Sequence, residues 1–208
     1  MSCNDVRGDG VPGIERSPMA KLDHRKTDDK LTAALIELLE EENLYRVQVS
    51  ELCAHARVNR TTFYKHYRDT PEFVSQLEKS LLDRMNDAFF FGNTFIHAIN
   101  IDAYQTFLQC VRFMQGENRP LVRALLGPNG SSSFRNKVVA MWAAQAEEAL
   151  LMRDPSVQER CNLEALSSCI AASMMSLLDL HLSEPAKYED EYFASQMALI
   201  LHDRLLMT

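Results

Sequence analysis

The segment VSELCAHARVNRTTFYKHYRDTPEF, residues 49–73, decides the fold. Its first part, from about residue 49 to 56, places small and apolar side chains on one face at helical spacing. A second helix is predicted from about residue 60 to 67, and Asn59 is a favourable N-cap for it. Residues 57–59 leave room only for a tight turn between the two helices. Two short helices joined by a three-residue turn predict a helix-turn-helix.

The second predicted helix has two unlike faces. Phe63 and Tyr67 stand four residues apart, so they share an apolar face that can pack against Leu52 and the preceding helices. The opposite side offers donors and positive charge: Thr61, Tyr64, Lys65 and Arg68, with Arg60 at the N-terminal end. Such side chains suit the guanine edges and phosphate oxygens of DNA. An ordinary amphipathic helix with a solvated polar face fits the same spacing.

The net charge of -7 is unusual for a nucleic-acid binder, but it is unevenly distributed. Most of the excess acid lies in residues 71–208. Residues 43–68 instead hold five basic side chains and one acidic side chain, Glu51. A local basic patch can bind phosphates while an acidic body discourages indiscriminate binding. Charge and spacing together leave the DNA-binding helix and the solvated amphipathic helix equally well supported.

The rest of the chain predicts an all-α fold. Only seven glycines and seven prolines occur in 208 residues, and no alternating strand pattern or repeat is present. Thr27 is expected to cap the first helix, and Thr70 is expected to cap the fourth, with Pro71 at its first helical position. The fourth helix should run to about residue 88, and further helices are expected at about 101–115, 118–126, 133–152, 157–182 and 188–206.

These helices predict three parts: a disordered arm at 1–20, a helix-turn-helix domain at 21–70 and a helical ligand-binding and dimerisation body at 71–208. Among the breaks between helices, the sequence Gly-Pro-Asn-Gly at 127–130 is expected to form a turn.

Residues 27–73 resemble the DNA-binding domain of the tetracycline-repressor (TetR) family. Its signature is a helix of small and apolar residues, a three-residue turn, and then Thr-apolar-Tyr-x-His-aromatic. The sequence Thr-Phe-Tyr-Lys-His-Tyr at 62–67 fits that signature position by position. The remaining chain has the length that this family uses for ligand binding and dimerisation. The resemblance implies a transcriptional regulator that binds DNA as a dimer.

The resemblance implies DNA contacts for nine residues: Val49, Ser50, Arg60, Thr61, Thr62, Tyr64, Lys65, His66 and Thr70. Arg60 and Thr61, at the start of the second helix, would face base edges. Thr62, Tyr64 and His66 would contact phosphates. Residues 49 and 50, at the start of the preceding helix, would lie near the DNA backbone.

Three positions depart from the family pattern. Arg57 replaces the usual turn glycine, which costs about 1 kcal/mol if the site requires positive φ. Gln48 replaces the usual serine or threonine cap of the first short helix and is a poorer cap. Thr70 replaces a lysine, so one charged phosphate contact is missing, although free N–H groups at a helix start can still meet a phosphate.

The body is expected to bind a small-molecule effector and a second copy of the chain. Helices near 157–182 and 188–206 carry broad apolar surface, which predicts a four-helix interface in a homodimer and a pseudo-palindromic operator. Methionine-rich helices adapt to irregular apolar ligands, although ordinary core packing is the alternative for each residue. The residues expected to line the effector pocket are Phe107, Val111, Met114, Met141, Trp142, Met174 and Met175.

The predicted function is a sequence-specific DNA-binding transcriptional regulator, acting as a repressor that an effector releases. Two alternatives remain: a protein of this fold that binds a protein partner, and a helical enzyme without a recognisable motif. The sequence lacks hydrolase, metalloprotease, Walker and dinucleotide motifs, and its six histidines have no metal-ligand spacing, so no catalysis, cofactor or metal is expected. Five cysteines without a C-x-x-C pair predict buried reduced thiols, as in a cytoplasmic protein. No apolar stretch near 18 residues is found, so no membrane span is expected.

Overall fold

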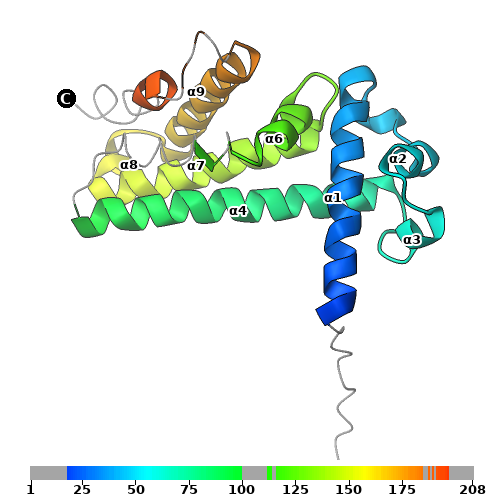
Figure 1. Ribbon diagram of the computed structural model, residues 1–208. Helices are drawn as coiled ribbons and strands as arrows, with labels where there is room; N and C mark the ends of the chain where they lie inside the picture. Colours follow the sequence, from blue (N-terminus) through cyan, green and yellow to red (C-terminus); the bar gives the residue numbers. More distant parts are fainter. Residues whose placement is uncertain are drawn as a thin grey trace, which may run out of the picture.

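The computed structural model describes residues 18–99, 112–113, 116–184, 187, 189 and 191–196. A helix-turn-helix unit lies at one end, and the long helix α4 runs from it along a bundle of helices (Figure 1). The described part contains no strand, so the predicted all-α class is confirmed. The helices are α1 (Pro18–Glu41), η1 (Leu44–Arg46), α2 (Val49–Ala56), α3 (Arg60–Tyr64), α4 (Thr70–Ile99), α6 (Arg119–Leu126), α7 (Ser132–Arg153), α8 (Val157–Arg160) and α9 (Leu163–Ser183).

Helix α1 begins nine residues before the predicted start. Pro18 occupies its first position, where the missing N–H has no intrahelical partner to lose and φ is already helical. Thr27 therefore does not cap the helix but lies inside it, with a buried side chain. Leu31, Leu35 and Leu38 are all buried, so they form one apolar stripe along the helix.

Helix α4 is longer than predicted and joins the two ends of the molecule. It continues to Ile99 because no proline interrupts it, and the single Gly92 is tolerated in a helix interior. Thirty residues give a rod of about 45 Å at 1.5 Å per residue. Its first turns belong to the helix-turn-helix unit, and its later turns lie alongside α7 (Figure 1).

The prediction of one helix over 157–182 is wrong. Helix α8 ends at Arg160, Cys161 has an extended backbone, and α9 begins at Leu163. The break is favoured by Asn162, whose side-chain oxygen accepts a 2.8 Å hydrogen bond from the Ala165 N–H and so caps α9. Residues 191–196 are helical, while the rest of the predicted 188–206 helix and nearly all of 101–115 lie outside the described residues.

Helix α9 also corrects the expectation that no segment could span a membrane. The 21-residue helix contains an 18-residue window with a mean hydropathy of 1.4, which satisfies the length and composition of a membrane helix. One side of α9 packs on α7 through buried residues that include Ile170, Met174 and Leu178. Of that window, 39% is buried inside the protein, and a core helix satisfies the same length and composition.

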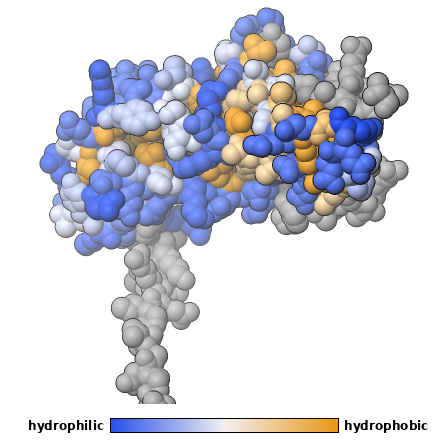
Figure 2. Space-filling model, turned by 180° about the vertical axis from the view of Figure 1, so that it is seen from behind, coloured by the Kyte–Doolittle hydropathy of each residue, from blue (hydrophilic) through white to orange (hydrophobic). Residues whose placement is uncertain are grey.

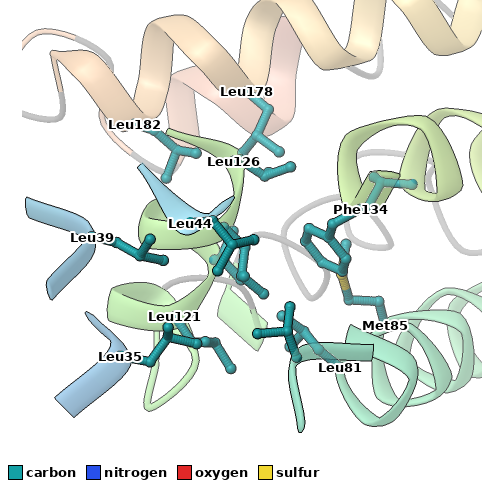
Figure 3. Close-up of a cluster of buried hydrophobic side chains, with 14 of the residues drawn as sticks. Leu35, Leu39, Leu44, Leu81, Met85, Leu121, Leu126, Phe134, Leu178 and Leu182 are labelled. Atoms are coloured by element: carbon teal, nitrogen blue, oxygen red, sulfur yellow. The ribbon is translucent and has the colours of Figure 1, made fainter. Parts of the chain in front are cut away.

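The buried side chains form one continuous cluster across the boundary predicted at residue 70. Figure 3 shows leucines of α1 and η1 lying close to side chains of α4, α6, α7 and α9. The helix-turn-helix unit and the body therefore share a core. The residues labelled in that view are Leu35, Leu39, Leu44, Leu81, Met85, Leu121, Leu126, Phe134, Leu178 and Leu182.

Of the cysteines within the described ranges, Cys53 is buried, and burial raises the pKa of its thiol. Cys161 is half-buried and Cys169 is exposed on α9, so the expectation of a buried thiol is wrong at Cys169.

The turn between α6 and α7 depends on Gly130. A Cβ added there would overlap the carbonyl oxygens of Ala124 and Leu125, which are backbone atoms of α6. Gly130→Ala should therefore lower the free energy of unfolding by about 1–3 kcal/mol in urea titrations. Gly116→Ala is the matched control, because its Cβ would lie 3.4 Å from the nearest oxygen, that of Arg112. Equal losses in the two variants would contradict this account of the turn.

Candidate nucleic-acid interface

The turn between α2 and α3 has the left-handed conformation that the family pattern implies. Arg57 has φ 52° and ψ 41°, and it is the one non-glycine residue with positive φ among those described. Its N–H donates to the Ala54 carbonyl at 3.2 Å, and the Val58 N–H donates to the Cys53 carbonyl at 3.0 Å. These bonds close the end of α2 and redirect the chain into α3, at a strain of about 1–2 kcal/mol for a non-glycine residue.

The capping predictions for the two short helices are confirmed. The Asn59 side-chain oxygen accepts a 2.8 Å hydrogen bond from the Thr61 N–H at the start of α3. Gln48 precedes α2 and forms no side-chain capping bond. Helix α3 therefore begins at a well-satisfied terminus, whereas the start of α2 leaves N–H groups without a cap from Gln48.

Three aromatic rings hold α3 in place. Phe63 is fully buried, with its ring centroid 5.5 Å from that of Tyr67 and 6.3 Å from that of Phe73. The Tyr67 hydroxyl donates a 2.6 Å hydrogen bond to Asp28 of α1. Burial, followed by this bond and the charge of Asp28, raises the pKa of Tyr67, so the hydroxyl remains a donor. The predicted anchoring face is thus confirmed.

Helix α3 ends at Tyr64, earlier than predicted, so Lys65 and Arg68 do not continue one helical face. The chain leaves the helix because Tyr67 turns inward and α4 begins soon after it. The cap of α4 is Asp69 rather than Thr70: an Asp69 carboxylate oxygen accepts from the Glu72 N–H at 2.8 Å. Glu72 in turn accepts from the Arg68 N–H at 2.7 Å, which resembles a capping box except that the second bond goes to the residue before the cap.

The cap at Asp69 was missed although the spacing of Asp69 and Glu72 is its sequence signal. The hydrogen bond from Glu72 is the main reason why the pKa of Asp69 is lowered. Thr70 is the first residue of α4 and only 6% exposed. Any DNA contact at Thr70 would therefore involve its backbone rather than its hydroxyl.

The predicted DNA-contact residues of α3 share one exposed surface. Arg60, Thr61, Tyr64 and Lys65 are exposed, with 58% of Tyr64 accessible although it is a large aromatic residue. Four further residues that the family resemblance assigns to DNA contact are half-buried: Val49, Ser50, Thr62 and His66. The structure therefore exposes the donors of α3, whereas Phe63 of the same helix is buried.

All five basic residues of the 43–68 segment are exposed. Arg68 contacts Asp69 at 3.2 Å, so part of its charge is locally compensated. The single acid of the segment, Glu51, lies close to Glu42, which follows α1. Desolvation and then the nearby Glu51 carboxylate raise the pKa of Glu42. The basic side chains thus dominate the surface charge around α2 and α3.

Four of the predicted effector residues lie within the described part of the body. Trp142, Met174 and Met175 are buried in the core, and Met141 is half-buried. An open hollow of about 540 Å³ lies instead along α7, lined by Ala144, Glu147, Glu148, Leu151 and Met152. Phe107, Val111 and Met114 lie outside the described residues.

Three solved structures align with most of this chain. The fatty acid degradation regulator FadR from Bacillus halodurans is 14% identical with a TM-score of 0.61, covering 92% of this chain and 98% of its own. The dihydroxyacetone kinase operon activator DhaS is 14% identical with a TM-score of 0.49, covering 84% of this chain and 93% of its own. RolR is 16% identical with a TM-score of 0.45, covering 83% of this chain and 89% of its own.

At these identities the likeness concerns the fold alone. The TM-score of 0.61 to FadR confirms the fold that the family resemblance implies. No protein-family model matches the chain, and no curated protein matches its sequence.

The left-handed conformation of Arg57 gives a direct stability test. Arg57→Gly removes the Cβ that makes positive φ unfavourable, so the free energy of unfolding should rise by about 1 kcal/mol. Arg57→Ala keeps the Cβ and should give no such gain. Urea titrations of the three proteins would compare them. An equal gain in both variants would show that the arginine side chain, not the backbone conformation, causes the strain.

Proposed function

We propose that the chain is a sequence-specific DNA-binding transcriptional regulator of the tetracycline-repressor family, and that α3 is its recognition helix. The observation that carries this proposal is the two-sided construction of α3. Phe63 fixes the helix from inside, while Arg60, Tyr64 and Lys65 stand exposed on the outer side. A helix held in this way, with donors outward, suits the major groove.

Each exposed group has a chemical role in this proposal. Arg60 and Thr61 lie at the start of α3 and reach base edges, where an arginine can bind guanine with two hydrogen bonds. Tyr64 and Lys65 lie at the end of α3 and contact phosphates or bases. The half-buried Thr62, His66, Val49 and Ser50 approach the DNA backbone, and Thr70 contributes a backbone group at the start of α4.

We also propose a homodimer formed through α9. Between Glu164 and Asp179 the helix has no charged residue, yet Ala172, Ser173 and Ser176 are exposed. Figure 2 shows apolar residues gathered on the body, whereas the helix-turn-helix end is largely hydrophilic. A second copy would cover such an uncharged helix face, and a two-fold dimer with one recognition helix per subunit would read a pseudo-palindromic operator.

Regulation in this proposal passes from the body to the DNA. An apolar small molecule that binds one arrangement of the body more tightly would shift the separation of the two recognition helices. Rigid half-sites on DNA tolerate little change in that separation, so the effector would release a repressor. The continuous core and the rod-like α4 support this coupling, since neither end can move independently of the other. A regulator of this kind acts in the cytoplasm.

Removal of the outer side chains of α3 tests the DNA contact. Tyr64→Ala combined with Lys65→Ala should weaken binding to a duplex selected from a random pool by about 2–4 kcal/mol, with unchanged helicity. Fluorescence anisotropy gives the affinity and circular dichroism the helicity. Lys79→Ala, which removes an exposed lysine of α4 in an ion pair with Asp83, is the control for lost charge. A folded double variant with wild-type affinity would reject α3 as the recognition helix.

Charge placed on α9 tests the dimer. Ala172→Glu puts a carboxylate on the proposed interface, where it would be desolvated, so the protein should become monomeric at micromolar concentration in light scattering. Ala140→Glu, at an exposed position of α7, should stay dimeric. A wild-type monomer under these conditions, or a dimeric Ala172→Glu protein, would refute the proposed interface.

A further inference from the structure

The turn that connects α6 to α7, residues 127–132, makes contacts that its sequence does not predict. The Asn129 side-chain amide donates a 3.0 Å hydrogen bond to the carbonyl of Leu39. The Leu44 N–H donates a 2.8 Å bond to the backbone carbonyl of Asn129. Leu39 lies in the last turn of α1, where carbonyls have no partner within the helix. One residue of the body therefore satisfies backbone groups on both sides of the α1–η1 junction.

The same turn is fixed to α4 on its other side. The Ser131 hydroxyl donates a 2.5 Å hydrogen bond to a carboxylate oxygen of Glu78 and accepts a 3.0 Å bond from the Phe134 N–H. Lys137 contacts the other oxygen of Glu78 at 2.7 Å. The Glu78 side chain is only 4% exposed. Because a buried carboxylate that loses its partners is strongly destabilising, these contacts hold the turn firmly against α4.

The turn has little freedom to change shape. The Gly130 N–H donates to the Gly127 carbonyl at 3.0 Å, and the Ser131 N–H donates to the Leu125 carbonyl at 2.8 Å. On the outer side, the Tyr45 hydroxyl and the Ser132 hydroxyl are 3.1 Å apart. Below the turn, Leu44 lies close to side chains of α1 and α6 (Figure 3). Polar and apolar contacts thus both stabilise the junction between the α6–α7 turn and the α1–η1 segment.

We propose that the α6–α7 turn sets the orientation of the helix-turn-helix unit relative to the body, and that Asn129 is its positioning residue. Helix α4 and the shared core connect the unit to the body, and the turn adds a hydrogen-bonded attachment at the end of α1. A displacement of α6, whose apolar side chains lie in the core, would then reach α1 and η1 directly through Asn129. The consequence for DNA affinity rests on the proposed function.

Asn129→Asp in the full-length protein tests this role. The substitution keeps the side-chain shape but replaces the donor by a carboxylate that faces the Leu39 carbonyl and the negative end of α1. Asn118→Asp is the matched control, because its amide also donates to a carbonyl, that of Phe113 at 3.1 Å, but within the body. Spin labels on unnatural amino acids at Ala54 and Ala140, both exposed, report the distance from α2 to α7. Dilution with unlabelled chains removes distances between subunits.

The distance distribution should broaden or shift in Asn129→Asp and remain as in wild type in Asn118→Asp. Asn129→Ala, which removes the amide without adding charge, should also broaden it and replaces Asn129→Asp if that variant does not fold. A wild-type distribution in folded Asn129 variants would overturn the positioning role.

Affinity for a selected duplex should fall by about tenfold in Asn129→Asp and stay within about twofold in Asn118→Asp, as expected for a typical coupling between distant sites. A broadened distribution with unchanged affinity would overturn the claim that this orientation limits DNA binding. A wild-type protein that binds no duplex at all would reject the proposed function, while the distance measurement would still decide the role of Asn129.

Discussion

The packing of Phe63 against Tyr67 and Phe73 is the contact on which the proposed interface depends. A helix of five residues has no independent stability in water, so α3 exists because its inner side is buried. Tyr67 extends the anchor to α1 through Asp28. Phe63 is buried while Arg60, Tyr64 and Lys65 are exposed, so the presentation of the proposed surface depends on this anchor as well as on the exposed residues themselves.

Local signals explain what could be predicted of the fold and of the site. Asn59, the small residues of α2 and the three-residue turn act over a few neighbouring positions, and the structure agrees with them. The end of α3 could not be predicted from local signals, because it depends on the burial of Tyr67 in the tertiary structure. The cap at Asp69 was visible in the sequence but stood next to an equally plausible Thr70, and the hydrogen bond from the Glu72 N–H to Asp69 distinguishes the two. The contacts of Asn129 join residues 90 positions apart, beyond the reach of any local pattern.

In the proposed regulator, the core shared between the two ends of the molecule would couple them. A flexible linker would allow each end to move without consequence for the other, whereas close-packed side chains transmit displacement. Besides this core, the continuous helix α4 and the hydrogen-bonded α6–α7 turn cross the junction. An arrangement with two attachments has few low-energy orientations, which is the condition for a discrete change between states rather than a gradual one.

The central claim is that the basic surface around α3 binds DNA, and the salt dependence of binding tests it most directly. Wild-type protein should bind a random-sequence duplex with an affinity that falls as a power of the salt concentration, because each neutralised phosphate releases counterions. For a dimer with several phosphate contacts per subunit, the loss between about 50 and 200 mM salt should be about a thousandfold or more. Absence of binding at low salt, or an affinity that does not change with salt, would contradict the account.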